Sequence, residues 1–193
     1  IYRMQQAQKA LAANPQTTRV VGHSLGGAVA LGLSLRNPDR VEKLILMAPG
    51  GIESREVYFA MPGIQAMVKH PMGSPDFTKD VLAALLTQLV YDPSAVDAAL
   101  VDERWATLET QNPHVLATMN IPDMTDRLRE IDIGTLVFWG SEDRFCPASG
   151  CWKVLQMKGP VQAEILNQCG HWVMSEYPGL FNKRCLSFLS DEG

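Results

Sequence analysis

The sequence predicts an α/β protein in which a mostly parallel sheet is flanked by helices and interrupted by an inserted helical segment. Short runs of β-branched and aliphatic residues alternate with helical patterns toward both ends of the chain, and this alternation favours parallel strands joined by helices. Between residues 52 and 122, successive helical patterns are separated by prolines, without a strand pattern. With 193 residues, 46% of them hydrophobic, the chain can bury one substantial core.

The elements before the insertion follow from hydrophobic spacing and turn residues. In order, the sequence predicts a helix over residues 1–14, a strand over 18–22, a helix over 25–38, and a strand from residue 41 to the Pro-Gly-Gly break at 49–51. Asn-Pro pairs end both helices, because the residue before a proline is disfavoured in helical conformation. The chain opens inside a helical pattern and without Met, so we expect an upstream portion to be missing.

The elements after the insertion continue the same alternation. They are a short helix over residues 124–131, a strand over 135–140, a helix near 149–156, a strand over 161–167 and an amphipathic helix over 177–189. The predicted organisation is therefore a core of residues 1–51 and 123–193, with the helical segment 52–122 inserted between its two halves.

Charge and cysteine content narrow the class of protein. The chain has 17 Lys and Arg against 21 Asp and Glu, a net charge of −4, and no long block of one sign that would attract nucleic acid or an anionic membrane. We find no signal-like or membrane-length apolar run, and Cys146, Cys151, Cys169 and Cys185 show no C-x-x-C spacing. We therefore expect a cytoplasmic protein without nucleic-acid or membrane partners.

A pentapeptide between the first predicted strand and the following helix carries the first chemical signal. Residues 22–26 read Gly-His-Ser-Leu-Gly, which matches the G-x-S-x-G nucleophile elbow, where small flanking residues allow a strained turn to expose the serine hydroxyl. The helix N-terminus behind Ser24 would direct the backbone N–H of Leu25 at a developing oxyanion. The alternative is a glycine-rich turn in which Ser24 merely caps the helix.

A serine nucleophile requires a histidine base and an orienting carboxylate. Asp143 follows the strand over 135–140, and His171 follows the strand over 161–167. Since the carboxyl ends of parallel strands meet at one edge of the sheet, both would lie on the same side as Ser24. Glu142 is the alternative acid, because the sequence does not reveal which of two adjacent carboxylates faces the imidazole.

The other histidines fit the role of base less well. His23 is fixed beside the nucleophile, whereas His70 and His114 lie next to prolines in the helical insertion. We interpret His70 and His114 as ordinary surface or packing residues.

Together these motifs resemble the α/β-hydrolase superfamily and, within it, the meta-cleavage product hydrolases of aromatic-ring degradation. The motifs are GHSLGG, LILMAPGG, WGSEDRF and CGHW followed by a glutamate. The resemblance implies the α/β-hydrolase fold, a catalytic triad of Ser24, Asp143 and His171, and a lid formed by residues 52–122. It also implies that part of the sheet and the loop donating a second oxyanion N–H precede residue 1.

The same resemblance implies a set of substrate-binding residues. Arg104 corresponds to an arginine that holds the substrate carboxylate, a role suited to a planar guanidinium, although a solvated helix arginine paired with a nearby acid is the alternative. Phe145 and Trp172 would line the pocket, or else belong to the core. His23 would hydrogen-bond the substrate or a loop, or simply pack in the turn.

Two other tryptophans, Trp105 and Trp139, are assigned to packing. The implied reaction needs no metal or organic cofactor.

The implied activity is hydrolysis of a carbon–carbon bond in 2-hydroxy-6-oxohexa-2,4-dienoates. The dienol would become a keto tautomer, the C6 carbonyl would be attacked, and 2-hydroxypenta-2,4-dienoate and a carboxylic acid would leave. Both an acyl-enzyme on Ser24 and a gem-diol formed by water that His171 activates remain open as routes. The resemblance further implies a small-molecule substrate and a homodimer. The alternatives are an esterase or lactonase on the same fold, or a non-catalytic hydrolase domain.

Overall fold

The computed structural model describes residues 9, 13, 16–112 and 120–190 of the chain. The helix expected over residues 1–14 falls almost wholly outside the described residues. His114 lies outside them too.

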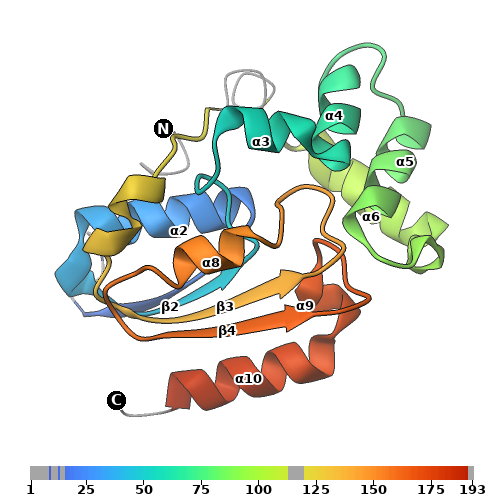
Figure 1. Ribbon diagram of the computed structural model, residues 1–193. Helices are drawn as coiled ribbons and strands as arrows, with labels where there is room; N and C mark the ends of the chain where they lie inside the picture. Colours follow the sequence, from blue (N-terminus) through green and yellow to red (C-terminus); the bar gives the residue numbers. More distant parts are fainter. Residues whose placement is uncertain (1–8, 10–12, 14–15, 113–119, 191–193) are drawn as a thin grey trace.

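Four parallel strands form one sheet in the described part of the chain, with the order β1-β2-β3-β4 (Figure 1). The strands are β1 (Thr18–His23), β2 (Val41–Met47), β3 (Gly134–Gly140) and β4 (Val161–Leu166). They match the runs predicted from the sequence. His23 pairs with Met47, Met47 with Phe138, and Gly140 with Leu166, so all four strands finish at one edge of the sheet.

Helices cover both faces of this sheet (Figure 1). One face carries α2 (Leu25–Arg36) and α8 (Gly150–Val154), and the other carries α9 (Val173–Glu176) and α10 (Pro178–Ser190). Buried side chains alternate between the two layers along each central strand, since successive residues of a strand point to opposite faces.

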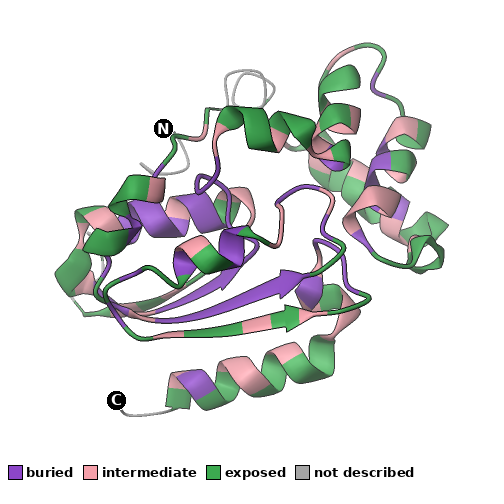
Figure 2. Cartoon of the chain, in the orientation of Figure 1, coloured by how far each residue is buried: buried purple, intermediate pink, exposed green. Residues whose placement is uncertain are grey.

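The two core clusters follow from this alternation. On β2, Leu44 and Leu46 pack in the cluster under α2 and α8, whereas Ile45 and Met47 pack in the cluster above α10. Figure 2 shows the central strands mostly in the colour of buried residues, and every residue of β2 from Leu44 on and of β3 from Thr135 on is buried. Because helices cover both faces of these strands, consecutive residues must be apolar and do not alternate with polar ones.

The inserted segment contains helices joined by turns and no strand in its described part, residues 52–112 and 120–122. Its elements are α3 (Arg55–Ala60), α4 (Pro62–Lys69), α5 (Lys79–Leu89), the 3₁₀ turn η2 (Pro93–Ala95) and α6 (Ala98–Glu109). Thr78 and Asp97 cap α5 and α6 by accepting hydrogen bonds from Val81 and Leu100 N–H groups.

This segment has a small core of its own and lies beyond the end of the sheet toward which the strands point (Figure 1). The buried residues of that core are Phe77, Leu82, Leu85, Leu86 and Val101. Because the strands end beneath it, the helical segment faces the edge at which the candidate catalytic residues were predicted.

Four short segments differ from the helical predictions outside the insertion. Residues 124–131 form a helix of the 3₁₀ type, η3 (Thr125–Glu130), and not an α-helix. The 3₁₀ turn η1 (Pro38–Arg40) and the four-residue α9 were not predicted, and α8 is shorter than residues 149–156. Each has six residues or fewer, which is too short for the hydrophobic period to fix the type of helix or its ends.

Candidate active site

The turn between β1 and α2 is a strained one centred on Ser24. Ser24 has φ 51° and ψ −118°, a left-handed conformation that non-glycine residues rarely adopt. Its N–H donates to the Met47 carbonyl at 3.0 Å, and its own carbonyl accepts from Gly50 N–H at 2.9 Å. A Cβ on Gly22 would lie 2.5 Å from the Gly26 carbonyl oxygen, so the close approach across the turn requires glycine.

Ser24 stands at the N-cap position of α2, but its hydroxyl does not cap the helix. Its side chain makes no capping hydrogen bond, which contradicts the alternative of a simple capping serine. The hydroxyl is therefore not engaged by the helix behind it. Leu25 is the first residue of α2, and its N–H has no acceptor among the described residues. A donor beside a strained, partly exposed serine is the arrangement expected of an oxyanion site.

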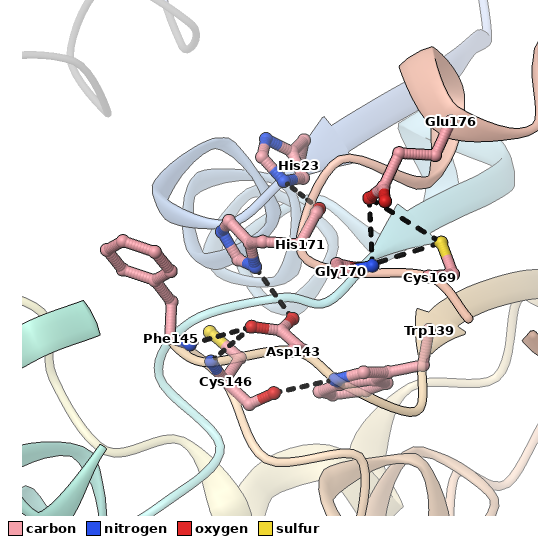
Figure 3. A network of polar contacts seen from close by, with 9 residues as sticks. All are labelled: His23, Trp139, Asp143, Phe145, Cys146, Cys169, Gly170, His171 and Glu176. Carbon is pink, nitrogen blue, oxygen red and sulfur yellow. Dashed lines mark hydrogen bonds and ion pairs between the residues drawn. The ribbon is translucent and has the colours of Figure 1, made fainter. Parts of the chain in front are cut away.

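Asp143 and His171 form a buried pair at the ends of β3 and β4 (Figure 3). Nδ1 of His171 lies 2.7 Å from Oδ2 of Asp143, and the two side chains are 2% and 0% exposed. The other carboxylate oxygen, Oδ1, accepts hydrogen bonds from the Phe145 and Cys146 N–H groups at 2.7 and 2.9 Å. These contacts use both carboxylate oxygens as acceptors, so they fix the orientation of Asp143 against the imidazole.

The structure decides between the two adjacent acids in favour of Asp143. Glu142 points elsewhere: its Oε2 accepts from the Ser141 hydroxyl at 2.5 Å and from Cys169 N–H at 3.1 Å. These hydrogen bonds, the Ser141 bond foremost, lower the pKa of Glu142. Glu142 steadies the loop before His171 without touching the imidazole.

The second nitrogen of His171 is left free for chemistry. Within the described residues, neither His171 Nε2 nor the Ser24 hydroxyl has a hydrogen-bond partner. The structure thus joins base and acid directly but does not join the base to Ser24. Catalytic hydrogen bonds of this kind commonly tighten only when substrate binds.

His23 links the serine turn to the histidine loop. Its Nε2 lies 2.9 Å from the His171 carbonyl oxygen and donates to it, and the two rings are 4.5 Å apart (Figure 3). Burial, followed by repulsion from His171, lowers the pKa of His23 to about 4. His23 is therefore a neutral N–H donor to a loop, one of the roles left open by the sequence.

Phe145 and Trp139 support the acid loop. The Phe145 ring is buried, 5.2 Å from the imidazole of His171, so it borders the candidate base while also packing in the core. Trp139 is fully buried, and its indole N–H donates to the Cys146 carbonyl at 2.9 Å. Trp139 has the packing role expected of it.

Arg104 lies over the ring of Trp172, the residue after the candidate base. The guanidinium carbon is 5.3 Å from the ring centre, a cation–π distance. Both residues line a cavity of about 390 Å³ that also includes Gln168 and Tyr177. The Arg104 side chain is 44% exposed, and its guanidinium nitrogen lies 3.8 Å from a carboxylate oxygen of Glu103 on the same helix. Arg104 therefore makes a long ion pair in addition to the cation–π contact with Trp172.

The remaining aromatic and histidine predictions concern the insertion. Trp105 packs against the small core of the helical segment and donates its N–H to Glu109. His70 ends α4 and is half-buried. Neither residue contacts the candidate triad in any interaction of the described chain.

Sequence reasoning assigned no role to Glu176. This carboxylate accepts hydrogen bonds from Gly170 N–H at 2.8 Å and from Tyr91 N–H at 2.7 Å. The glutamate that follows the CGHW motif is Glu176, so the sequence did mark this residue. Its partner Tyr91 lies in the insertion, far away in the sequence, and the pattern could not reveal that contact.

Residues 9, 13, 16–112 and 120–190 contain neither a candidate metal site nor a candidate membrane-spanning helix. No cluster of three or more His, Cys, Asp or Glu residues there could hold a metal ion. None of the helices there combines the length and apolarity needed to span a bilayer.

Comparison with known proteins places this geometry in a family. The chain is 34% identical to a 2-hydroxy-6-oxononadienedioate/2-hydroxy-6-oxononatrienedioate hydrolase of Comamonas testosteroni and to a 2-hydroxy-6-oxo-6-phenylhexa-2,4-dienoate hydrolase of Burkholderia cepacia. The matches cover 91% and 89% of this chain but 64% and 62% of the two relatives. The chain therefore spans less than two thirds of their length, and its expected resemblance to such hydrolases is confirmed.

Solved structures agree on the fold. A serine hydrolase from the polyaromatic-hydrocarbon-degrading bacterium Cycloclasticus zankles superposes with a TM-score of 0.80 at 26% identity, covering 98% of this chain and 71% of that one. A meta-cleavage product hydrolase from Pseudomonas fluorescens IP01 gives 0.78 at 22% identity, covering 92% and 66%. Residues 4–184 match the family model described as "Alpha/beta hydrolase family". The parallel sheet flanked by helices is thus that of the α/β-hydrolase fold, and the chain belongs to the alpha/beta hydrolase family.

Proposed function

We propose that this chain carries the catalytic residues of a serine-dependent hydrolase that cleaves a carbon–carbon bond in 2-hydroxy-6-oxohexa-2,4-dienoates. The observation that carries the proposal is the buried Asp143–His171 pair, which lies at the same sheet edge as the strained Ser24 turn. The names of the two curated relatives support this substrate class, since both are hydrolases of 2-hydroxy-6-oxo acids.

Each member of the triad has a role suited to its environment. Asp143 accepts from Nδ1 of His171 at 2.7 Å and thereby keeps the proton on that nitrogen. Nε2 is then free to take a proton from the Ser24 hydroxyl or from a water molecule. The Leu25 N–H stabilises the oxyanion that forms when the C6 carbonyl is attacked.

Arg104 is the proposed anchor for the substrate carboxylate. A cation–π contact, 5.3 Å from the guanidinium carbon to the ring centre, places the Arg104 side chain over Trp172. A guanidinium can also bind a carboxylate through two N–H groups. Because Trp172 follows His171 directly, a carboxylate bound at Arg104 would be tethered one residue away from the base. Phe145 would form the apolar wall beside the imidazole.

The helical segment 52–122 is proposed to act as the lid of this site, between core segments 1–51 and 123–193. Its small core, centred on α5 and α6, forms a cluster of its own. Met67 and Leu89 pack against both this core and the sheet's larger cluster, so they join the proposed lid to the rest of the chain. His23 is proposed to brace the loop of the base rather than to bind substrate.

We further propose that the protein is a cytoplasmic homodimer. Sedimentation velocity at micromolar concentration should give the dimer mass, and fractionation of the source cells should recover the protein with cytoplasmic markers. A monomer, or recovery in the membrane or exported fraction, would contradict this.

The test is a stopped-flow panel of ring-fission dienoates with 6-phenyl, 6-methyl and carboxylated 6-substituents. Ser24→Ala should abolish cleavage of every substrate. Arg104→Gln should raise KM at least about tenfold with a smaller effect on kcat, because it removes binding of the carboxylate. Arg127→Gln is the matched control, since Arg127 is an exposed arginine paired with Glu130 in η3.

The control should behave as the wild type. Equal turnover by all variants would refute the assignment of Ser24 and Arg104. Rapid hydrolysis of p-nitrophenyl acetate combined with no cleavage of any dienoate would instead identify an esterase on the same triad.

A further inference from the structure

The loop that carries the candidate base is bonded directly to the helical segment. His171 N–H and Trp172 N–H both donate to the carbonyl oxygen of Leu89, at 2.8 and 3.2 Å. Leu89 is the last residue of α5. The backbone of the base is therefore held by the end of one helix of the proposed lid.

Glu176 adds a second bridge between the same two segments. One carboxylate oxygen accepts from Gly170 N–H at 2.8 Å, and the other accepts from Tyr91 N–H at 2.7 Å. Figure 3 shows the Glu176 carboxylate directed at Gly170 and Cys169, on the side of the histidine loop away from Asp143. A single side chain from α9 thus satisfies one donor in the histidine loop and one just beyond α5.

Cys169 completes the bridge on the histidine side. Its thiol lies 3.7 Å from the same Glu176 oxygen that binds Gly170. Burial, followed by the charge of Glu176, raises the pKa of Cys169 to about 12, so the thiol stays protonated and serves as a weak donor. All three groups that face the carboxylate are donors.

The two segments approach each other too closely for any side chain to separate them. A Cβ on Gly170 would lie 2.7 Å from the Leu89 carbonyl oxygen and 2.8 Å from the Val90 carbonyl carbon. Real Cβ atoms do not make contacts this short, and the obstacles are backbone atoms. The position of residues 89–91 and that of the histidine loop are therefore coupled by contact as well as by hydrogen bonds.

We propose that Glu176 is a positioning residue for His171: it sets the orientation of the base only while the end of α5 is docked on the histidine loop. The carboxylate fixes Gly170, the residue before His171, and ties it to Tyr91 in the helical segment. This inference rests on the proposed function, because it assumes that His171 is the base for Ser24. It adds that opening of the helical segment would loosen the base.

The decisive variant is Glu176→Gln. Glutamine has the same size but presents one oxygen and one NH₂ group, so either Tyr91 N–H or Gly170 N–H faces a donor instead of an acceptor. Glu164→Gln is the matched control, since Glu164 is a partly exposed carboxylate that pairs with Arg184 at 2.7 Å on β4 and α10. Glu176→Asp, which keeps the charge but is one methylene shorter, serves as the second variant if Glu176→Gln is insoluble.

Two measurements on the purified protein read out the proposal without a dienoate. The first is the second-order rate at which a fluorophosphonate labels Ser24, which depends on a correctly oriented base. The second is amide hydrogen exchange of peptides that contain residues 89–91 and 168–172. Both are recorded well below the melting temperature of every variant, so that global stability does not enter.

In Glu176→Gln we expect labelling to slow roughly tenfold, since small misplacement of a catalytic group is amplified in the rate. Exchange should rise in both peptides, while Glu164→Gln should match the wild type in both measurements. If the wild type is labelled and Glu176→Gln is labelled at the same rate, the inference is overturned while the proposed function stands. The same conclusion follows if exchange becomes faster in only one of the two peptides. A wild type that is not labelled at all would refute the proposed function, and the inference with it.

Discussion

Replacing Asp143 by asparagine tests the core of the site with the smallest change in shape. Asp143 accepts three hydrogen bonds, two through Oδ1 from Phe145 and Cys146 N–H groups and one through Oδ2 from His171 Nδ1. Asparagine has only one oxygen. Since two backbone N–H groups converge on Oδ1, the amide oxygen will take that position and the NH₂ group will face the imidazole.

The consequence is a change of tautomer rather than of fold. An NH₂ group opposite Nδ1 requires that nitrogen to accept a hydrogen bond, so the ring proton moves to Nε2. The nitrogen that should take the proton from Ser24 is then already protonated. In serine enzymes the wrong tautomer costs about 10⁴ in kcat, or about 5.4 kcal/mol of activation free energy at 1.36 kcal/mol per factor of ten.

The assay is cleavage of the best dienoate, with fluorophosphonate labelling of Ser24 as a substrate-independent check. Asp143→Asn should fall about 10⁴-fold in kcat and keep a cooperative thermal transition, because its hydrogen-bond count is preserved. Glu142→Gln is the comparison, and it should lower kcat only a few fold because Glu142 holds the loop at Cys169 N–H. Asp143→Asn that retains a tenth of the wild-type rate, or a larger loss in Glu142→Gln, would refute the reasoning.

Three further predictions concern buried polar groups. The pKa of His23 is about 4 in the folded chain, against an ordinary value of 6.5. Between these pH values the unfolded chain binds more protons than the folded chain, so the free energy of unfolding falls as pH falls. Urea unfolding should show a loss of about 1 kcal/mol between pH 6 and pH 5, and His23→Gln should reduce this loss. Lys153→Met should destabilise by about 2–3 kcal/mol in the same assay, because it strands the buried Glu53 carboxylate, 2.6 Å away, and adding Glu53→Gln should recover part of the loss. Iodoacetamide at pH 8 should modify the half-buried Cys185 before the buried Cys169, as peptide mass spectrometry would reveal.

Much of the fold could be predicted because each strand is followed by a turn with a recognisable residue, either a glycine or proline that ends the strand or a candidate catalytic side chain. The β-branched run before Ser24 and the aliphatic run before Pro49 are too short for helices and are bounded by glycine or proline. Parallel strands that end at one edge then bring Ser24, Asp143 and His171 to the same side. The four-residue α9 escaped prediction, and η3 was predicted as a helix without its 3₁₀ type, because neither segment is long enough for the hydrophobic period to decide.

The sequence could not predict the directions in which the side chains of the site point. Asp143 and Glu142 are neighbours of the same chemical type, and only the turn after β3 determines that one faces the imidazole while the other faces Cys169 N–H. The same holds for His23, whose acceptor is a carbonyl in the distant loop at His171. Spacing along the chain carries no information about such pairs.

The contact between the insertion and the base is the clearest case of what tertiary structure adds. Leu89 ends α5, whose sequence resembles any amphipathic helix, and Tyr91 lies just beyond it. The Leu89 carbonyl nevertheless accepts from two N–H groups of the histidine loop, and Tyr91 N–H shares the Glu176 carboxylate with Gly170 N–H. Since buried backbone donors are expensive to leave unpaired, moving the helical segment away must expose or re-pair these N–H groups. In the mechanism that we propose, opening of the helical segment and loosening of His171 are one event. A variant that opens the segment should therefore lower the rate of the chemical step and the affinity for substrate together.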